Sequence, residues 1–147
     1  MKRITRSALV RHGAEEVYAL VDAIEAYPGF LPWCLAAQVH ERTGESTLAT
    51  LTVGVRGVRQ SFTTRNENTP GRAIRMHLVE GPFRHFHAEW RFQPLAPQAS
   101  KVEFTFEYEF STRLLARLLE PLFERIADTM VDAFVRRADA IYGNAQG

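Results

Sequence analysis

The stretch that decides the fold is Ser111–Tyr142, with the sequence STRLLARLLEPLFERIADTMVDAFVRRADAIY. Its apolar side chains recur every three or four residues, at Leu115, Leu118, Leu119, Leu122, Ile126, Met130, Phe134 and Ile141. This spacing predicts an amphipathic helix with a broad apolar face, about 45 Å long. Ser111 or Thr112 is suited to cap its first turn, and Gly143 to end it. Pro121 lacks an N–H group, so we expect a kink or a restarted helix there.

Almost everything upstream of this helix has the alternating pattern of β-strands. Val102–Phe110 is the clearest case, because its apolar residues alternate with polar ones. The same pattern predicts further strands over residues 4–10, 35–39, 49–55, 58–66, 74–78 and 86–92, and a short helix is expected over residues 14–24. Strands with one polar face, joined by short turns, are typical of antiparallel sheets. We therefore predict one α+β domain over residues 1–147, in which a curved antiparallel sheet wraps around the C-terminal helix.

The segment Tyr27–Cys34 does not fit a regular element, because it holds two prolines, a glycine and three aromatic residues. It is expected to form a turn or a short helical piece at one end of the sheet. Its bulky side chains have two interpretations. They either fill the core as a structural plug or form a lip over a pocket.

The overall composition is that of an ordinary globular protein, with 46% hydrophobic and 24% charged residues. A formal net charge of +1 gives no global electrostatic reason to expect nucleic acid or an anionic membrane as a partner. The single cysteine, Cys34, excludes an internal disulfide. The sequence also has no apolar run of about 18 residues, so we expect a cytoplasmic protein.

The apolar sides of the last three strands are expected to face the long helix. They collect Ile74, Met76, Leu78, Phe86, Trp90, Phe92, Phe104, Phe106, Tyr108 and Phe110. These side chains either interdigitate as a solid core or leave a lipophilic cavity that binds a small hydrophobic ligand. Gln60, Thr64 and Asn66 alternate in phase with Phe62, so polar groups are expected on the same inner face. Buried polar groups need a partner, which favours the cavity.

No motif in the sequence indicates catalysis. There is no nucleophile elbow and no phosphate-cradling glycine loop, and Cys34 beside Trp33 is typical of an inert buried thiol. His85, His87 and Glu89 share one face of a strand and are the best candidates for metal ligands, with His77 on a neighbouring strand. The same alternation turns them towards solvent, where they can pair with charged neighbours. We expect no catalytic residue and no metal site.

Arginines provide a possible binding surface. Arg56, Arg59, Arg65, Arg72, Arg75, Arg84 and Arg91 are expected on strands or turns, several of them on the outer face of the sheet. They form either a basic patch for RNA or phospholipid head groups, or an ordinary solvated face balanced by glutamates.

Several segments together resemble a known family. They are Tyr27-Pro28-x-Phe30-Leu31-Pro32-Trp33-Cys34, Phe62-Thr63-Thr64-Arg65-Asn66, Glu80-Gly81-Pro82-Phe83-Arg84, Trp90-Arg91-Phe92-Gln93-Pro94-Leu95 and Met130-Val131-Asp132-Ala133-Phe134. In this order, over essentially the whole chain, they are similar to the coenzyme Q-binding START-domain family. Its bacterial members are called RatA-type toxins and were earlier labelled polyketide cyclases. One local difference is that Ala88 precedes Glu89-Trp90 where the family often has glycine, which puts cavity volume near Trp90 in doubt.

The resemblance implies a helix-grip fold around a lipophilic cavity, and two functions. The first is non-enzymatic binding or transport of a polyprenyl quinone such as ubiquinone, in support of respiration. It implies a transient contact with the inner membrane and no cofactor other than this ligand. The cavity would be lined by Phe30, Trp33, Gln60, Phe62, Thr64, Asn66, Met76, Trp90, Phe92, Phe104, Phe106, Tyr108, Met130 and Phe134.

The alternative is a ribosome-associating toxin that blocks the joining of ribosomal subunits. It would use a surface of arginines, with phosphate contacts expected from Arg56, Arg59, Arg65, Arg75, Arg84 and Arg91. No DNA partner is expected. A third possibility, a cyclase, requires an acid or base inside the cavity, and the strand phases supply none.

Overall fold

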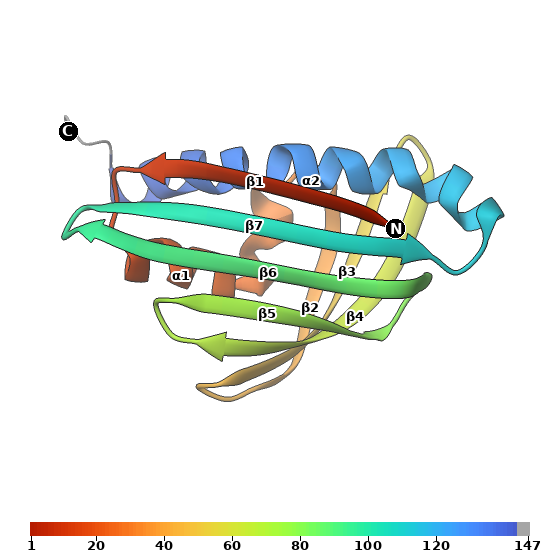
Figure 1. Ribbon diagram of the computed structural model, residues 1–147, viewed down its shortest axis with the longest axis horizontal. Coiled ribbons are helices and arrows are strands. Elements are labelled where there is room, and N and C mark those ends of the chain that lie inside the picture. Colours follow the sequence, from red (N-terminus) through yellow and green to blue (C-terminus); the bar gives the residue numbers. More distant parts are fainter. Residues whose placement is uncertain (144–147) are drawn as a thin grey trace.

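A computed structural model describes residues 1–143 of the 147-residue chain (Figure 1). The elements in chain order are β1 Lys2–Val10, α1 Ala14–Asp22, the 3-10 helix η1 Ile24–Gly29, β2 Cys34–Arg42, β3 Ser46–Val55, β4 Val58–Thr69, β5 Ala73–Glu80, β6 Phe83–Ala96, β7 Ala99–Phe110 and α2 Arg113–Tyr142. Every strand expected from the sequence is present. None of the helices in the described part of the chain has the length and apolarity needed to cross a membrane.

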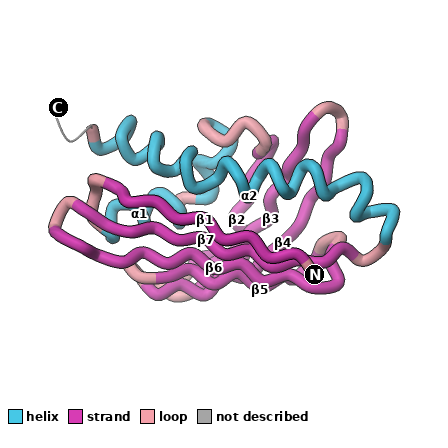
Figure 2. Tube along the Cα trace, turned by 45° about the horizontal axis from the view of Figure 1, so that its top comes forward, coloured by secondary structure: helices cyan, strands magenta, loops and turns pink. Residues whose placement is uncertain are grey.

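The seven strands form one antiparallel sheet in the order β1-β7-β6-β5-β4-β3-β2. Strands adjacent in sequence are neighbours from β2 to β7, as in a meander, and β1 then pairs with β7, with Ile4 opposite Phe106. The sheet curves, and α2 lies along its inner side (Figure 2). The predicted α+β helix-grip fold is therefore confirmed. Residues 144–147 of the expected domain lie outside the described residues.

Helix α2 begins as the sequence predicts but passes through Pro121 differently. Thr112 is the N-cap, and its Oγ1 accepts a hydrogen bond of 3.1 Å from the Leu115 backbone N–H. The helix then runs as one element from Arg113 to Tyr142 with Pro121 inside it, so of the two outcomes expected there the restart is wrong, and the kink stays a prediction. A single proline removes one backbone hydrogen bond, and the packing of the flanking turns against the sheet offsets that loss.

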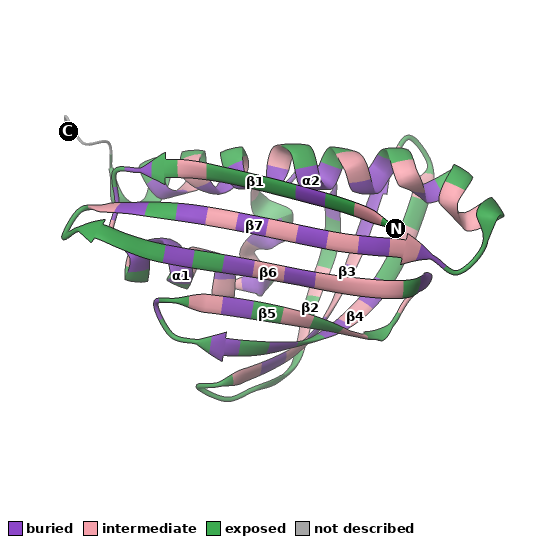
Figure 3. Cartoon of the chain, in the orientation of Figure 1, coloured by how far each residue is buried: buried purple, intermediate pink, exposed green. Residues whose placement is uncertain are grey.

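The buried face of α2 agrees with the predicted one over five positions and differs at its margins. Leu119, Leu122, Ile126, Met130 and Phe134 are buried as predicted, whereas Leu118 and Ile141 are 54% and 49% exposed. The helix also buries Phe123, Ala127, Val131 and Ala138, and Figure 3 shows the alternation of buried and exposed positions along it. The helical period fixes which residues share a face, whereas the sheet decides which neighbouring face it covers.

The segment Tyr27–Cys34 is a plug at one end of the core. Tyr27, Leu31 and Trp33 are each at most 5% exposed, and the Tyr27 hydroxyl donates a hydrogen bond to the backbone carbonyl of Val21. Phe30 lies at the outer edge of the plug, where it is half-buried. Of the two interpretations, core filling therefore holds for this segment, and Phe30 is the residue that also reaches its surface.

Candidate functional site

The interior beneath α2 contains most of the predicted cavity residues. Eleven of them are buried, namely Trp33, Phe62, Thr64, Asn66, Trp90, Phe92, Phe104, Phe106, Tyr108, Met130 and Phe134. Phe30 and Met76 are half-buried against the same core. Gln60 is not part of it, because its side-chain amide is partly exposed near the β3–β4 turn and donates to the Ser61 carbonyl at 2.8 Å. The contact of these predicted cavity residues with a ligand stays a prediction.

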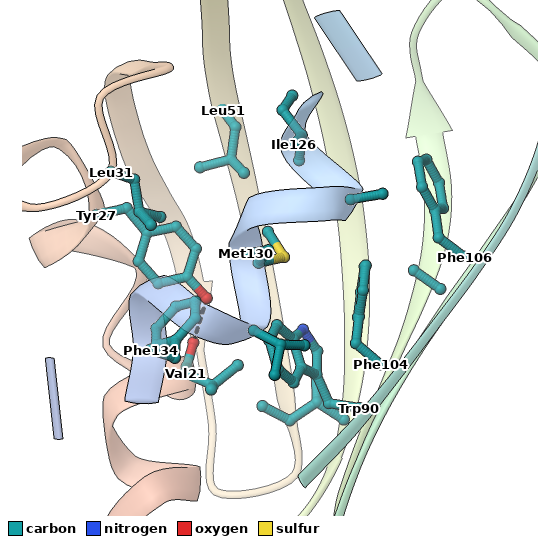
Figure 4. Close-up of a cluster of buried hydrophobic side chains, with 14 of the residues drawn as sticks. Val21, Tyr27, Leu31, Leu51, Trp90, Phe104, Phe106, Ile126, Met130 and Phe134 are labelled. Atoms are coloured by element: carbon teal, nitrogen blue, oxygen red, sulfur yellow. Dashed lines mark hydrogen bonds between the residues drawn. The ribbon is translucent and has the colours of Figure 1, made fainter. Parts of the chain in front are cut away.

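Large side chains nearly fill this interior. Trp90 packs against Phe104 and Phe134 with ring centroids 4.7 and 5.4 Å apart, and Tyr27 meets Phe134 at 5.4 Å (Figure 4). A cavity of about 20 Å³ remains, lined by Val21, Asp22, Ile24, Tyr27, Ala49, Leu51, Thr64, Asn66, Ile74, Met76 and Trp90. This volume suits about one water molecule. Of the two packing alternatives, the structure has the solid core, and a quinone ring would require these side chains to move apart.

One wall of the small cavity is polar. Thr64 Oγ1 donates to Asn66 Oδ1 at 2.8 Å. Asn68 Nδ2 donates to Asp22 Oδ1 and to Thr47 Oγ1, each at 3.2 Å. The Asn68 Oδ1 atom has no hydrogen-bond partner within residues 1–143. The predicted polar character of the inner face is therefore confirmed for Thr64 and Asn66.

Asp22 is a residue that the strand phases could not supply, because it ends α1 rather than lying on a strand. The cavity therefore has one acidic side chain, which comes from a helix and not from a strand. Burial raises the pKa of the Asp22 carboxyl above its ordinary value, an effect that the nearby Arg42 guanidinium partly opposes. No signal for this position was present in the sequence, because the helix was expected to continue to residue 24 whereas α1 ends at Asp22. One carboxyl group does not constitute the acid–base pair that a cyclase mechanism needs.

His77, His85 and His87 lie on the outer face of the sheet, as expected. Each pairs with a different carboxylate, His77 with Glu67 at 2.9 Å, His85 with Glu107 at 3.6 Å and His87 with Glu89 at 3.9 Å. Residues 1–143 contain no cluster of three His, Cys, Asp or Glu side chains suited to hold a metal ion. The structure therefore offers a charged surface here in place of a converging ligand set.

Cys34 is 4% exposed. Burial raises the pKa of its thiol to about 11, although a contact with the Ala36 carbonyl partly opposes this. The thiol is consequently protonated at neutral pH, and a protonated thiol is a poor nucleophile.

The six arginines predicted to contact phosphate do not form one patch. Four of them lie within 4.0 Å of a carboxylate, in the pairs Arg65–Glu41 at 3.5 Å, Arg75–Glu89 at 3.6 Å, Arg84–Glu109 at 3.2 Å and Arg91–Glu89 at 2.9 Å, with Glu89 shared by two arginines. Arg56 and Arg59 lie apart from these, at the β3–β4 turn. Only Arg75 and Arg91 come together, around Glu89, beside a hollow of about 520 Å³ that Arg72 and Lys101 also line.

A second hollow was missed by the sequence analysis. It is a groove of about 490 Å³ between the plug and the second half of α2, lined by Phe30, Pro32, Trp33, Arg125, Thr129, Ala133, Arg136, Arg137 and Ala140. Arg137 stacks on Phe30, with its guanidinium carbon 4.8 Å from the ring centroid. The helical spacing of Arg125, Thr129, Ala133 and Arg136 was visible in the sequence, but the groove exists only where α2 meets the distant plug. We call it the plug–helix groove.

Comparison with known proteins places this chain in a family. The family model described as polyketide cyclase / dehydrase and lipid transport matches residues 10–135. The chain is 41% identical over 143 residues to ribosome association toxin RatA of Vibrio cholerae, an alignment that covers 97% of this chain and 99% of that one. It is 28% identical over 151 residues to coenzyme Q-binding protein COQ10 homolog B, mitochondrial, of Xenopus laevis, covering 99% of this chain and 62% of the relative.

The fold has solved counterparts. The crystal structure of the Zhui aromatase/cyclase from Streptomyces sp. R1128 matches with a TM-score of 0.86 and 19% identity, covering 99% of this chain and 98% of that one. At this identity the likeness concerns the fold alone. Sequence and fold agree: the chain belongs to the polyketide cyclase / dehydrase and lipid transport family and, within it, to the family of the ribosome association toxin RatA.

Proposed function

We propose that this protein is a non-enzymatic binding protein that associates with the ribosome. The observation that carries the proposal is the filled interior, because a cavity of about 20 Å³ leaves the surface as the place where this fold can meet a partner. The end-to-end similarity to proteins named ribosome association toxins supports it. Association with the ribosome requires neither a catalytic acid–base pair nor a ligand bound inside the protein.

Local charge supports the same proposal. The chain has a net charge of only +1, yet many of its arginines lie on the surface. Arg125 and Arg137, on the second half of α2, have no carboxylate within 4.0 Å among residues 1–143. Cations without a protein partner are the ones whose charge is available to phosphate.

The test is sedimentation of the purified protein with ribosomes and separated subunits through sucrose gradients. We expect the protein to travel with ribosomal particles at low salt and to dissociate as salt is raised, because phosphate contacts release counterions on binding. A protein that remains at the top of the gradient at low salt overturns the proposal. If binding does not depend on the salt concentration, the protein associates with ribosomes without the phosphate contacts proposed here.

A second candidate is the binding of a hydrophobic ligand with a polar head, most simply a polyprenyl quinone. It is favoured by the polar wall of the interior cavity, where Thr64 and Asn66 are 4% and 3% exposed inside an otherwise apolar core. The similarity to a protein named for coenzyme Q binding supports it. Binding would require Trp90, Phe104 and Phe134 to separate, at the expense of their mutual packing.

Native mass spectrometry with organic extraction tests this candidate. A polyprenyl quinone that copurifies, and that is lost in Met130→Trp, would support it, since the larger side chain fills the interior next to the cavity. If Met130→Trp bound quinone as well as the unaltered protein does, the interior would not be the binding site.

A further inference from the structure

The two flanks of α2 differ in whether their charged side chains have partners of opposite charge. The flank beside β1 carries Glu120, Glu124, Asp128 and Asp139, and each of these carboxylates has a basic partner. Lys2 pairs with Glu120 and Glu124, Arg6 bonds Asp128 at 2.6 Å, and His12 bonds Asp139 at 2.8 Å. Three basic side chains therefore face four carboxylates on this flank, with Lys2 shared by Glu120 and Glu124.

The opposite flank lines the plug–helix groove and is basic. Arg136 is paired with Asp132 at 2.9 Å, one turn earlier on the helix. Arg125 and Arg137 have no carboxylate within 4.0 Å in the part of the chain that the structure describes. The groove therefore presents uncompensated positive charge, although the whole chain is nearly neutral.

The other wall of the groove is aromatic. Phe30 lies there with Arg137 stacked on its ring. Trp33 also lines the groove, and its indole N–H has no hydrogen-bond partner within residues 1–143, although the residue is only 4% exposed. A positively charged groove that follows the phosphate backbone is one feature of proteins that bind single-stranded nucleic acid. The Phe30 ring is covered by Arg137 and Trp33 is buried, so the groove is suited to the backbone and not to base stacking.

We propose that the plug–helix groove binds the phosphodiester backbone of a single-stranded RNA segment, with Arg125 and Arg137 as its phosphate contacts. The inference rests on the proposed ribosome association and names the surface responsible. Guanidinium groups pair with phosphate oxygens in a two-pronged geometry, which the ammonium group of lysine does not provide.

A lipid head group is disfavoured by the shape and lining of the groove. Membrane-binding surfaces insert exposed apolar side chains next to their basic residues. The helical residues between the arginines are Thr129, Ala133 and Ala140, which are too small to insert. The exposed leucines of α2, Leu114 and Leu118, do not line the groove.

Three double variants with the same loss of charge test the proposal. Arg125→Ala/Arg137→Ala alters the groove. Arg113→Ala/Arg117→Ala alters the same helix outside the groove, and Arg56→Ala/Arg59→Ala alters the β3–β4 turn. Ala140→Glu adds a carboxylate to the groove at an exposed helical position and leaves both arginines and the stacked ring in place.

Each variant is measured by sedimentation with ribosomes and by fluorescence anisotropy with a labelled single-stranded oligoribonucleotide, across a salt series. We expect the groove pair to lose about tenfold or more in affinity and to lower the salt slope by about one per arginine, for both targets. Ala140→Glu should weaken binding in the same direction. The two control pairs should retain affinity within about twofold of the unaltered protein. Thermal unfolding verifies that each variant is folded.

The outcomes separate the two proposals. If the unaltered protein binds ribosomes but all three pairs lose affinity equally, or the β3–β4 pair alone does, the groove is not the contact surface and only this inference fails. If the unaltered protein binds neither ribosomes nor the oligoribonucleotide, both proposals fail. Binding to vesicles of anionic phospholipid that is lost in the groove pair, without RNA binding, would assign the groove to lipid phosphate and also overturn the inference.

Discussion

Arg137 and Phe30 join the surface of this protein to its core. The Arg137 guanidinium carbon lies 4.8 Å from the centroid of the Phe30 ring, and the same ring meets Phe134 edge-on at 5.2 Å. Phe134 in turn packs on Trp90, which lines the interior cavity. One half-buried ring therefore separates the plug–helix groove from the interior, so a change at the groove reaches the core through two aromatic contacts.

Phe134 is expected to be a major source of stability. It is 1% exposed and meets Tyr27, Phe30 and Trp90. Replacing it with alanine should lower the free energy of unfolding by about 3–5 kcal/mol, because the large cavity cannot be refilled by its neighbours. Urea unfolding measures this loss. Leu118→Ala, at a position 54% exposed, should change the free energy by no more than about 0.5 kcal/mol, and an equal effect at both sites would contradict the core described here.

The N-cap of α2 gives a second stability prediction. Thr112→Ala removes the acceptor for the Leu115 N–H and should lower the free energy of unfolding by about 1 kcal/mol. Thr112→Ser keeps the hydroxyl group and should retain most of the stability. The comparison is made by chemical denaturation of both variants. Equal losses would show that the methyl group of Thr112, not its hydrogen bond, matters.

Cys34 predicts a loss of stability at alkaline pH. The pKa of its thiol is about 11 in the folded protein, above its ordinary 9.0. The unfolded chain therefore releases the proton first, and the free energy of unfolding should fall as the pH rises from about 9 to about 11. Unfolding measured across this range should show a shallower fall in Cys34→Ala. Alkylation by iodoacetamide at neutral pH should also be much slower for the folded protein than for the urea-unfolded chain; fast alkylation of the native state would contradict the burial of the thiol.

Asp22 predicts a pH effect in the acidic range. Its pKa is raised by burial, so the folded protein keeps this proton to higher pH than the unfolded chain, whose carboxyl titrates near 3.8. The contribution of Asp22 to stability is therefore greatest at low pH and declines as the pH rises through the folded-state pKa.

Asp22→Asn should accordingly gain stability relative to the unaltered protein as the pH is raised from acidic to neutral. The amide oxygen can still accept the hydrogen bond from Asn68, so the shape of the site is kept. Glu41→Gln, which alters the exposed pair with Arg65, is the matched control and should show no such gain. Urea unfolding at several pH values decides between them; a relative loss of stability in Asp22→Asn at neutral pH would refute the raised pKa.

The alternating strand pattern predicted most of the fold. It placed Thr64 and Asn66 inside because side chains of a strand change face with each residue, and that rule depends on no other part of the chain. It failed at Gln60, near the β3–β4 turn, where the inner face is no longer fully covered. On α2, Leu118 and Phe123 were interchanged, because helical spacing does not fix the rotation of a helix against its partner.

The candidate sites were harder to predict than the fold for a physical reason. Whether Trp90, Phe104 and Phe134 leave an open cavity depends on how their rings pack, which no periodicity encodes. The plug–helix groove lies between Phe30 and Arg137, which are distant in sequence and meet only after folding. The predicted arginines were real surface residues, but the carboxylates that lie beside four of them come from sequence positions that local patterns do not connect.

The pairing of β1 with β7 has a consequence for how the protein is made. Ile4 is synthesised at the start of the chain, whereas its partner Phe106 comes late, and α2 comes last. A nascent chain that has not yet reached residue 99 holds a first strand without its neighbour and a sheet without its covering helix. Because such distant contacts must wait for both ends, folding is completed only near the end of synthesis. A product that ends before residue 99 consequently lacks the partner strand of β1 and the helix that covers the sheet.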